Sequence, residues 1–285
     1  MKRRIRVQAV AGSRPARAIP VLALIASVAV VGGCKPVASA DGTSSQGSHS
    51  ASGGGTGGGT SGGNGSGPVT TDGHAVSPLA DTDGTKPGLA PIISAADRSA
   101  ARDLINRLTT QAPAGMSGYT REQFGQAWTD GAVGDPFADN GCDTRDDVLA
   151  RDGQNVQDEA KGKSAHCVVE SMTLFNPYTG QNIQFTKKNA TAVQIDHVLP
   201  LGYSWQMGSS RWTAARREQL ANDPLELLAV DGPDNGAKGD SGPGAWMPPL
   251  KAVGCSYAVR FAQVAIKYQL PVASADKTAM LGQCA

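Results

Sequence analysis

The chain has 285 residues, with 26 Lys and Arg against 25 Asp and Glu, which gives a formal net charge of +1. Six of the basic residues and none of the acidic ones lie in the first 33 residues, so residues 34–285 carry 20 basic against 25 acidic side chains, a net charge of −5. This balance excludes the global basic surface with which high-affinity nucleic-acid binders hold phosphates. Any polyanion must therefore be held locally or through a metal ion.

Residues 1–33 are typical of a secretory signal, because basic residues lead into an apolar run from Ala18 to Val31. The run is too short for a comfortable membrane-spanning helix. The sequence Val31-Gly-Gly-Cys34 resembles the bacterial lipobox, whose cysteine is diacylated and becomes the new N-terminus. An ordinary signal peptide that contains a cysteine is the alternative. We expect a lipid anchor at Cys34 on the extracellular face of a bacterial cell membrane, with secretion as the second choice.

Residues 34–93 are rich in Gly, Ser and Thr and contain almost no large apolar side chains. Such a segment cannot bury enough apolar surface to offset the entropy of ordering it. The composition therefore predicts a disordered tether over residues 34–93, followed by one folded domain over residues 94–285.

The domain begins with helical patterns and then changes to strands. Ser94 is a plausible N-cap for a helix with an apolar stripe at Ala101, Leu104, Ile105 and Leu108. A helix or turn is predicted at 119–128 and a helix entered at 140–149. Strands are predicted at 167–175, 182–186, 192–198 and 225–230. Further helices are predicted at 211–221, 257–268 and 274–282, and a loop that opens a helix at 231–239. Helices, then strands, then strand–loop–helix is an α+β pattern.

Four cysteines remain in the domain if Cys34 is lipidated, an even number in an exported chain. Two disulfides are expected, with three possible pairings, of which we favour the local ones, Cys142–Cys167 and Cys255–Cys284. A zinc site that uses His166 and Cys167 is the competing hypothesis, but no CxxC or HExxH spacing supports it.

The candidate catalytic residue is His197, which follows Asp196 at the end of a β-rich run and is succeeded by Pro200. An imidazole is the side chain best suited to proton transfer near neutral pH. The sequence has no GxSxG elbow for a serine hydrolase, and paired cysteines exclude a thiol nucleophile. A structural Asp–His pair in a β-rich core is the alternative reading.

Several segments around this pair resemble the HNH endonucleases. The matching residues are 194–201, Trp205, Trp212, 222–230 and 235–240, together with 140–145 and 246–249. More narrowly, they resemble the secreted actinobacterial branch related to the C-terminal domain of the GmrSD type IV restriction enzymes. The likeness extends over about residues 119–284. It implies a ββα-metal fold, in which two strands and a helix surround one divalent ion, with flanking helices added.

The resemblance also implies roles for individual residues. His197 matches the general base that deprotonates water, Asp196 and Asn235 match the metal ligands, and Lys238 would contact a phosphate. The ion would be Mg²⁺, with Mn²⁺ as the second choice. The middle position of the H-N-H triplet usually holds Asn, but here Glu226 matches it, with Asn222 nearby; either side chain would orient the imidazole.

These assignments predict a metal-dependent endonuclease that acts outside the cell, with DNA as the first choice of substrate. We expect a monomer that is anchored to the membrane through Cys34 and has no protein partner. A catalytically inactive HNH-fold binding module is the first alternative, motivated by the altered middle position and the net acidity; a cell-wall hydrolase is the second. Two further choices stay open. Arg145 is either an ion-paired residue at a helix start or a DNA contact. The four tryptophans are either core anchors or base-stacking platforms: Trp128, Trp205, Trp212 and Trp246.

Overall fold

The computed structural model describes residues 74–160 and 166–285, all of which belong to one compact unit. The predicted signal, Cys34 and most of the predicted tether lie outside the described residues. Within the described ranges, no helix has both the length and the apolar character needed to cross a membrane.

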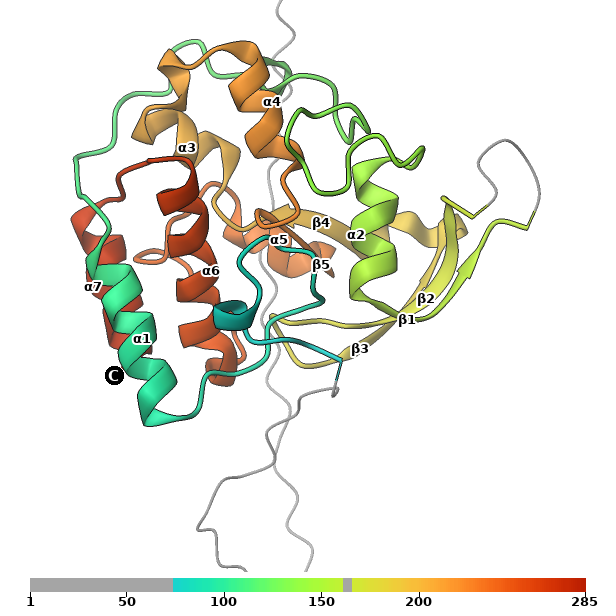
Figure 1. The fold of residues 1–285 in the computed structure, drawn as a ribbon, viewed down its shortest axis with the longest axis horizontal. Coiled ribbons are helices and arrows are strands. Elements are labelled where there is room, and N and C mark those ends of the chain that lie inside the picture. The colour runs from blue at the N-terminus through green and yellow to red at the C-terminus, as the bar shows by residue number, and fades with distance from the viewer. Residues whose placement is uncertain (1–73, 161–165) are drawn as a thin grey trace, which may run out of the picture. The chain divides into compact units, whose positions relative to one another are not determined.

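Three helices form one side of the domain (Figure 1): α1 (Ala95–Asn106), α6 (Gly254–Lys267) and α7 (Ser274–Gln283). Helix α1 begins where predicted, because the Ser94 hydroxyl accepts a hydrogen bond from the Asp97 N–H at 3.0 Å. Helix α6 is buried over most of its length and contacts both α1 and α7. The disulfide Cys255–Cys284 joins the start of α6 to the residue after α7, which confirms one predicted pairing.

A three-stranded antiparallel sheet lies on the other side, with the order β1 (Gly153–Asp158), β2 (Val169–Phe175), β3 (Asn182–Thr186). Helix α2 (Thr144–Asp152) packs against this sheet and begins at the Asp143 cap. The disulfide Cys142–Cys167 closes the same region and confirms the second predicted pairing. Strand β1 was not predicted, because its sequence Gly-Gln-Asn-Val-Gln-Asp is polar and lacks β-branched alternation.

The remaining elements form the centre of the domain: β4 (Val193–His197), α3 (Leu201–Met207), α4 (Ala214–Asn222), β5 (Leu227–Asp231) and α5 (Gly232–Lys238). Strands β4 and β5 pair antiparallel, with His197 opposite Leu227. Helix α5 follows β5 directly, because the Asp231 carboxylate accepts from the Asp234 N–H, and it contacts both strands. The two strands and α5 give the predicted ββα arrangement within an α+β fold. Pro200 breaks the strand as expected, but it also begins α3, which was not predicted.

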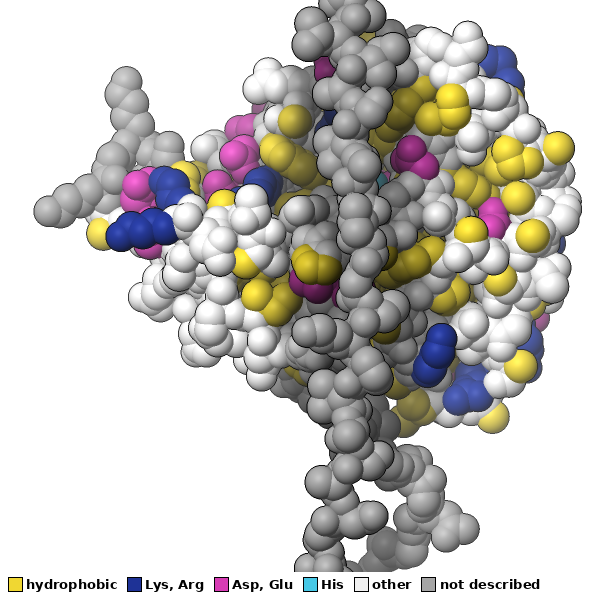
Figure 2. Space-filling model, turned by 180° about the vertical axis from the view of Figure 1, so that it is seen from behind, with side chains coloured by type: hydrophobic (Ala, Val, Ile, Leu, Met, Phe, Trp, Pro, Cys, Tyr) yellow, Lys and Arg dark blue, Asp and Glu magenta, His cyan; other side chains and the backbone are white. Residues whose placement is uncertain are grey.

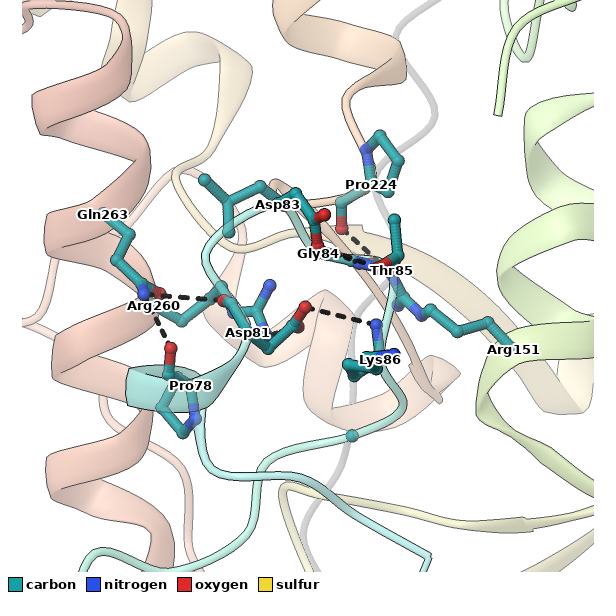
Figure 3. A network of polar contacts seen from close by, with 12 residues as sticks. Pro78, Asp81, Asp83, Gly84, Thr85, Lys86, Arg151, Pro224, Arg260 and Gln263 are labelled. Atoms are coloured by element: carbon teal, nitrogen blue, oxygen red, sulfur yellow. Dashed lines mark hydrogen bonds and ion pairs between the residues drawn. The ribbon is translucent and has the colours of Figure 1, made fainter. Parts of the chain in front are cut away.

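The folded domain starts before residue 94, so the predicted boundary between tether and domain is wrong (Figure 3). Asp81 forms a buried ion pair with Arg260 of α6, and Gln263 donates to the Pro78 carbonyl at 2.7 Å. Arg151 of α2 donates to the carbonyls of Gly84 and Pro224 at 2.7 and 2.9 Å. Apolar anchoring comes from two core residues, Leu89 and Ile92. Long-range ion pairing, which local composition does not reveal, offsets the entropy of ordering this polar segment.

Gly84 is required in this segment for a steric reason. Its φ is +79°, and a Cβ added there would lie 2.1 Å from the Leu225 backbone nitrogen. Any side chain at this position would therefore push the segment away from the start of β5.

Candidate active site

A pocket of about 260 Å³ lies beside the C-terminal end of β4. It contains three of the predicted site residues, Asp196, His197 and Asn235, which confirms that the chain brings them together. Glu226 and Lys238 do not line it. The pocket is completed by residues that were not predicted to be functional: Tyr119, Arg121, Ile195, Pro200, Leu201, Gly239 and Asp240.

The His197 ring is held by one backbone hydrogen bond. Its Nε2 lies 3.0 Å from the carbonyl oxygen of Ala221, the penultimate residue of α4. A carbonyl can only accept, so Nε2 carries the proton and Nδ1 is the nitrogen with a lone pair. The Trp128 ring stacks against the imidazole at a centroid separation of 5.7 Å and an interplanar angle of 13°. The position of His197 at the end of β4, its bond to the Ala221 carbonyl and its contact with the Trp128 indole together fix the orientation of the imidazole ring.

The imidazole is neutral at physiological pH. Burial is the main cause that lowers its pKa to about 3, and the positive charges of Arg121 and Lys238 act in the same direction. The hydrogen bond to Ala221 opposes them by raising the pKa. His197 is therefore a preformed proton acceptor in the absence of substrate.

Neither of the two side chains considered for orienting His197 is its hydrogen-bond partner. Asn222 donates through Nδ2 to the Glu218 carbonyl at 2.9 Å. Glu226 accepts the Leu199 N–H on Oε2 at 3.1 Å. The partner is instead the backbone of Ala221, which no sequence signal could have indicated, because every residue type supplies a carbonyl.

Glu226 is fully buried, and burial raises the pKa of its carboxyl group well above the usual value. Burial therefore favours the protonated acid, which, like the amide of Asn, offers a carbonyl oxygen as acceptor. Its bond to Leu199 fixes the turn after β4. This accounts physically for Glu at a position where the resemblance leads one to expect Asn.

Lys238 is also buried and does not face the pocket. Its ammonium lies 2.8 Å from Asp196 Oδ1 and 2.6 Å from the His197 carbonyl oxygen, with no exposed side-chain surface. The Tyr178 hydroxyl donates to Asp196 Oδ2. Because α5 packs on β4, the Lys238 side chain points inward, and in this arrangement it cannot contact a phosphate. It connects α5 to the end of β4 instead.

These contacts also decide how the predicted metal ligands fit a divalent ion. Both oxygens of Asp196 are engaged, and the Asn235 amide donates to Gln194 Oε1 at 2.9 Å. Within residues 74–160 and 166–285, no group of three or more His, Cys, Asp or Glu side chains is arranged to hold a metal. An ion at this site would share Asp196 with the Lys238 ammonium, because each carboxylate oxygen already accepts one hydrogen bond and has one further lone pair. Magnesium stays a prediction of the resemblance.

Comparison with known proteins identifies the family to which this site belongs. The family described as "GmrSD restriction endonucleases, C-terminal domain" matches residues 143–283. The chain belongs to this family. An "Uncharacterized secreted protein" of Arthroderma benhamiae is 37% identical over 191 residues, which cover 65% of this chain and 85% of that relative. No solved structure matches the chain. The narrower assignment to an actinobacterial branch stays a prediction.

The matched range of the GmrSD C-terminal domain includes β4, β5 and α5 but not every residue of the pocket. Tyr119 and Arg121, which begin the predicted short helix at 119–128, precede it. Arg121 starts the 3-10 turn Arg121–Phe124 and is half-buried, and its Nη1 has no hydrogen-bond partner among the described residues. Burial lowers the pKa of its guanidinium. The sequence shows an arginine beside aromatic anchors there, but it does not show that this turn lies against the end of β4.

The charge around the GmrSD-type pocket is local rather than global. On the uncovered part of the face in Figure 2, Lys and Arg side chains occur in small groups, some of them beside Asp and Glu side chains. Among the residues that line the pocket, His197 is neutral, Asp196 is paired with Lys238, and Asp240 is exposed. Arg121 therefore provides a cation that is not already committed to a carboxylate of the pocket.

Proposed function

We propose that this domain hydrolyses phosphodiester bonds of nucleic acid outside the cell, as an endonuclease with DNA as the preferred substrate. The observation that carries the proposal is the neutral imidazole of His197, fixed by the Ala221 carbonyl so that Nδ1 is the acceptor, in a pocket that also holds Arg121. Membership of a restriction-endonuclease family supports the choice of nucleic acid.

A phosphodiester is an anion that repels hydroxide, so its hydrolysis requires a water deprotonated in place and a cation at the phosphate. His197 Nδ1 accepts the proton of the attacking water, whose oxygen forms the new bond to phosphorus as the bond to the departing 3′-oxygen breaks. Arg121 binds the phosphate oxygens through its fork of N–H donors. An anionic phosphate beside His197 raises the pKa of the imidazole, which makes it a stronger base once substrate is bound.

Lys238 and Asp196 act as positioning residues in this scheme. The Lys238 ammonium holds the carbonyl of His197, and Asp196 holds the ammonium. Together they fix the last residue of β4 and therefore the place of the base. If a divalent ion binds, Asp196 and Asn235 would hold it, and it would supply further positive charge at the phosphate.

The extracellular location is part of the proposal. Two disulfides are typical of exported proteins, and the relative from Arthroderma benhamiae is described as secreted. We further propose that Cys34 is lipidated and that the domain acts as a monomer at the cell surface.

The test is cleavage of supercoiled plasmid by the purified protein, with and without Mg²⁺ or Mn²⁺. His197→Ala should reduce the rate by about 10²- to 10⁴-fold, the usual contribution of a general base, while its circular dichroism stays that of the wild type. Arg211→Gln, which removes an exposed cation outside the pocket, is the control and should cleave normally. Full activity of His197→Ala would exclude the scheme. Binding without cleavage by the wild type would instead identify an inactive binding module, and clearing of peptidoglycan that survives loss of His197 would identify a cell-wall hydrolase.

A further inference from the structure

A second pocket, of about 410 Å³, lies against the same strand as the first. Its lining includes Trp128, Arg145 and Thr191, together with Gln194 and Ile195 of β4. Ile195 lines both pockets. The two hollows are therefore neighbours along β4 rather than separate features of the surface.

Two side-chain contacts connect the pockets further. Trp128 lines the second pocket and stacks on His197 of the first. Gln194 lines the second pocket and accepts a hydrogen bond from Asn235 of the first. A chain-like ligand seated in the first pocket would therefore meet Trp128 and Gln194 as it continues into the second.

The backbone at Trp128 is in an unusual conformation. Its φ is +58°, in the left-handed region that a bulky side chain rarely adopts. Conformations of this kind persist where the surrounding structure imposes them, and they cluster at binding sites. Trp205 is buried in the main core, where Trp212 and Trp246 also pack as the anchors that were predicted, and Trp128 packs in the same way against the second core cluster. Trp128 is half-buried and lies between the base and the second pocket.

Arg145 provides positive charge in the second pocket. It forms no salt bridge with the described carboxylates, so the predicted ion pair with Asp146 or Asp147 is wrong. Its guanidinium lies over the Phe185 ring, and its Nη2 donates to the carbonyls of Ala190 and Val193 at 3.5 Å, which is long for a hydrogen bond. These long contacts orient the group without saturating its five donors.

We propose that the second pocket binds the nucleoside next to the scissile phosphate, with its base against Trp128 and the following phosphate against Arg145. The inference rests on the proposed function and specifies its substrate: a strand of at least two nucleotides with a base accessible for stacking. An aromatic face with an arginine beside it suits this ligand, since base stacking tolerates any base and the arginine pairs with the backbone. The subsite thus provides affinity without sequence readout.

The experiment compares two substrates with the same leaving group. The thymidine 4-nitrophenyl phosphodiesters (5′ and 3′ isomers) carry a nucleoside, whereas methyl 4-nitrophenyl phosphate carries none. Two variants change the second pocket without touching His197: Thr191→Trp fills it, and Arg145→Gln removes its charge. Thr278→Trp on α7 and Arg211→Gln are the matched controls, because both positions are exposed and lie outside both pockets.

Thr191→Trp should raise the KM of the better thymidine isomer by about 10-fold or more, a change typical of losing one stacked base. The kcat/KM of the methyl diester should stay within about twofold of wild type, and both controls should behave as wild type. Arg145→Gln should weaken binding of a fluorescent thymidine oligomer and reduce its salt dependence. Equal loss on both substrates, or no loss on either, would overturn the subsite. If the wild type cleaves plasmid but neither small substrate, oligomer binding by Arg145→Gln decides the subsite; if it does not cleave plasmid either, the proposed function fails.

Discussion

Replacing Lys238 by Met tests the internal support of the site most directly. The change removes a fully buried ammonium from Asp196 and from the His197 carbonyl and leaves an apolar side chain of similar length. Breaking one side of a buried ion pair costs about 3–5 kcal/mol, because the remaining charge stays uncompensated. Asp196 would keep only the Tyr178 hydroxyl, and its pKa, already raised by burial, would rise further without the opposing lysine charge.

The measurement is the free energy of unfolding in urea at pH 7 for wild type, Lys238→Met, Asp196→Asn and the double variant. The two single changes should each cost several kcal/mol, and the double variant should be much more stable than their sum implies, because it contains no unpaired charge. Additive costs, or a loss below about 1 kcal/mol for Lys238→Met, would refute the buried pair.

The same variants locate the predicted divalent ion. In the wild type an ion at Asp196 must compete with the charge of an ammonium, whereas in Lys238→Met it need not. Thermal unfolding with Mg²⁺ or Mn²⁺ should therefore show a larger ion-dependent stabilisation in Lys238→Met, about 2.7 kcal/mol at 100 times the dissociation constant. The stabilisation should vanish when Asp196→Asn is added. Equal stabilisation in all variants would place the ion elsewhere.

Four further predictions follow from buried charges. Asp81→Ala should cost about 3–5 kcal/mol in urea unfolding by leaving Arg260 unpaired, and adding Arg260→Met should recover part of the loss. Burial raises the pKa of Asp135 to about 6 against 3.8 in the unfolded chain, so the folded state holds this proton more tightly. The free energy of unfolding should therefore fall as the pH rises from about 4 to about 6. Asp135→Asn should raise the free energy of unfolding by about 1–3 kcal/mol at pH 7.5 and leave it unchanged below about pH 4. The kcat/KM should stay flat as the pH falls through 6.5, because the pKa of free His197 is about 3; a decline centred near 6.5 would contradict its burial. Glu226→Gln should leave the free energy of unfolding at pH 7 within about 1 kcal/mol of wild type, since a neutral acceptor replaces a protonated acid, and a large loss would indicate that Glu226 is ionised.

Local sequence signals were sufficient for the elements that carry the base. Apolar runs predicted β4 and β5, and an Asp with a following loop predicted α5. Even the disulfides followed from spacing, because near neighbours close with the least loss of chain entropy. These features depend on residues within about 30 positions of one another, which is the range over which pattern and spacing carry information.

What the sequence could not reveal depends on distant partners. The order of residues 74–93 requires Arg260, which lies 179 residues from Asp81. The direction of the Lys238 side chain depends on how α5 packs on β4, since a lysine at a helix end is compatible with either a phosphate or a buried carboxylate. Arg121 enters the pocket because its turn packs against α4, a tertiary contact with no local signature.

The charge of the pocket cannot be read from the charge of the chain. Residues 34–285 carry a formal charge of −5, which argues against a polyanionic substrate only if each carboxylate near the site acts as a free anion. Asp196 is offset by Lys238, and burial raises the pKa of Glu226, which favours its uncharged form. Arg121, in contrast, keeps its charge in a half-buried position where water screens it less than at the surface. The local charges therefore differ from the net charge of the chain: Arg121 offers a cation in a pocket that also contains the carboxylate of Asp240, and in the proposed reaction a bound phosphate would raise the pKa of His197.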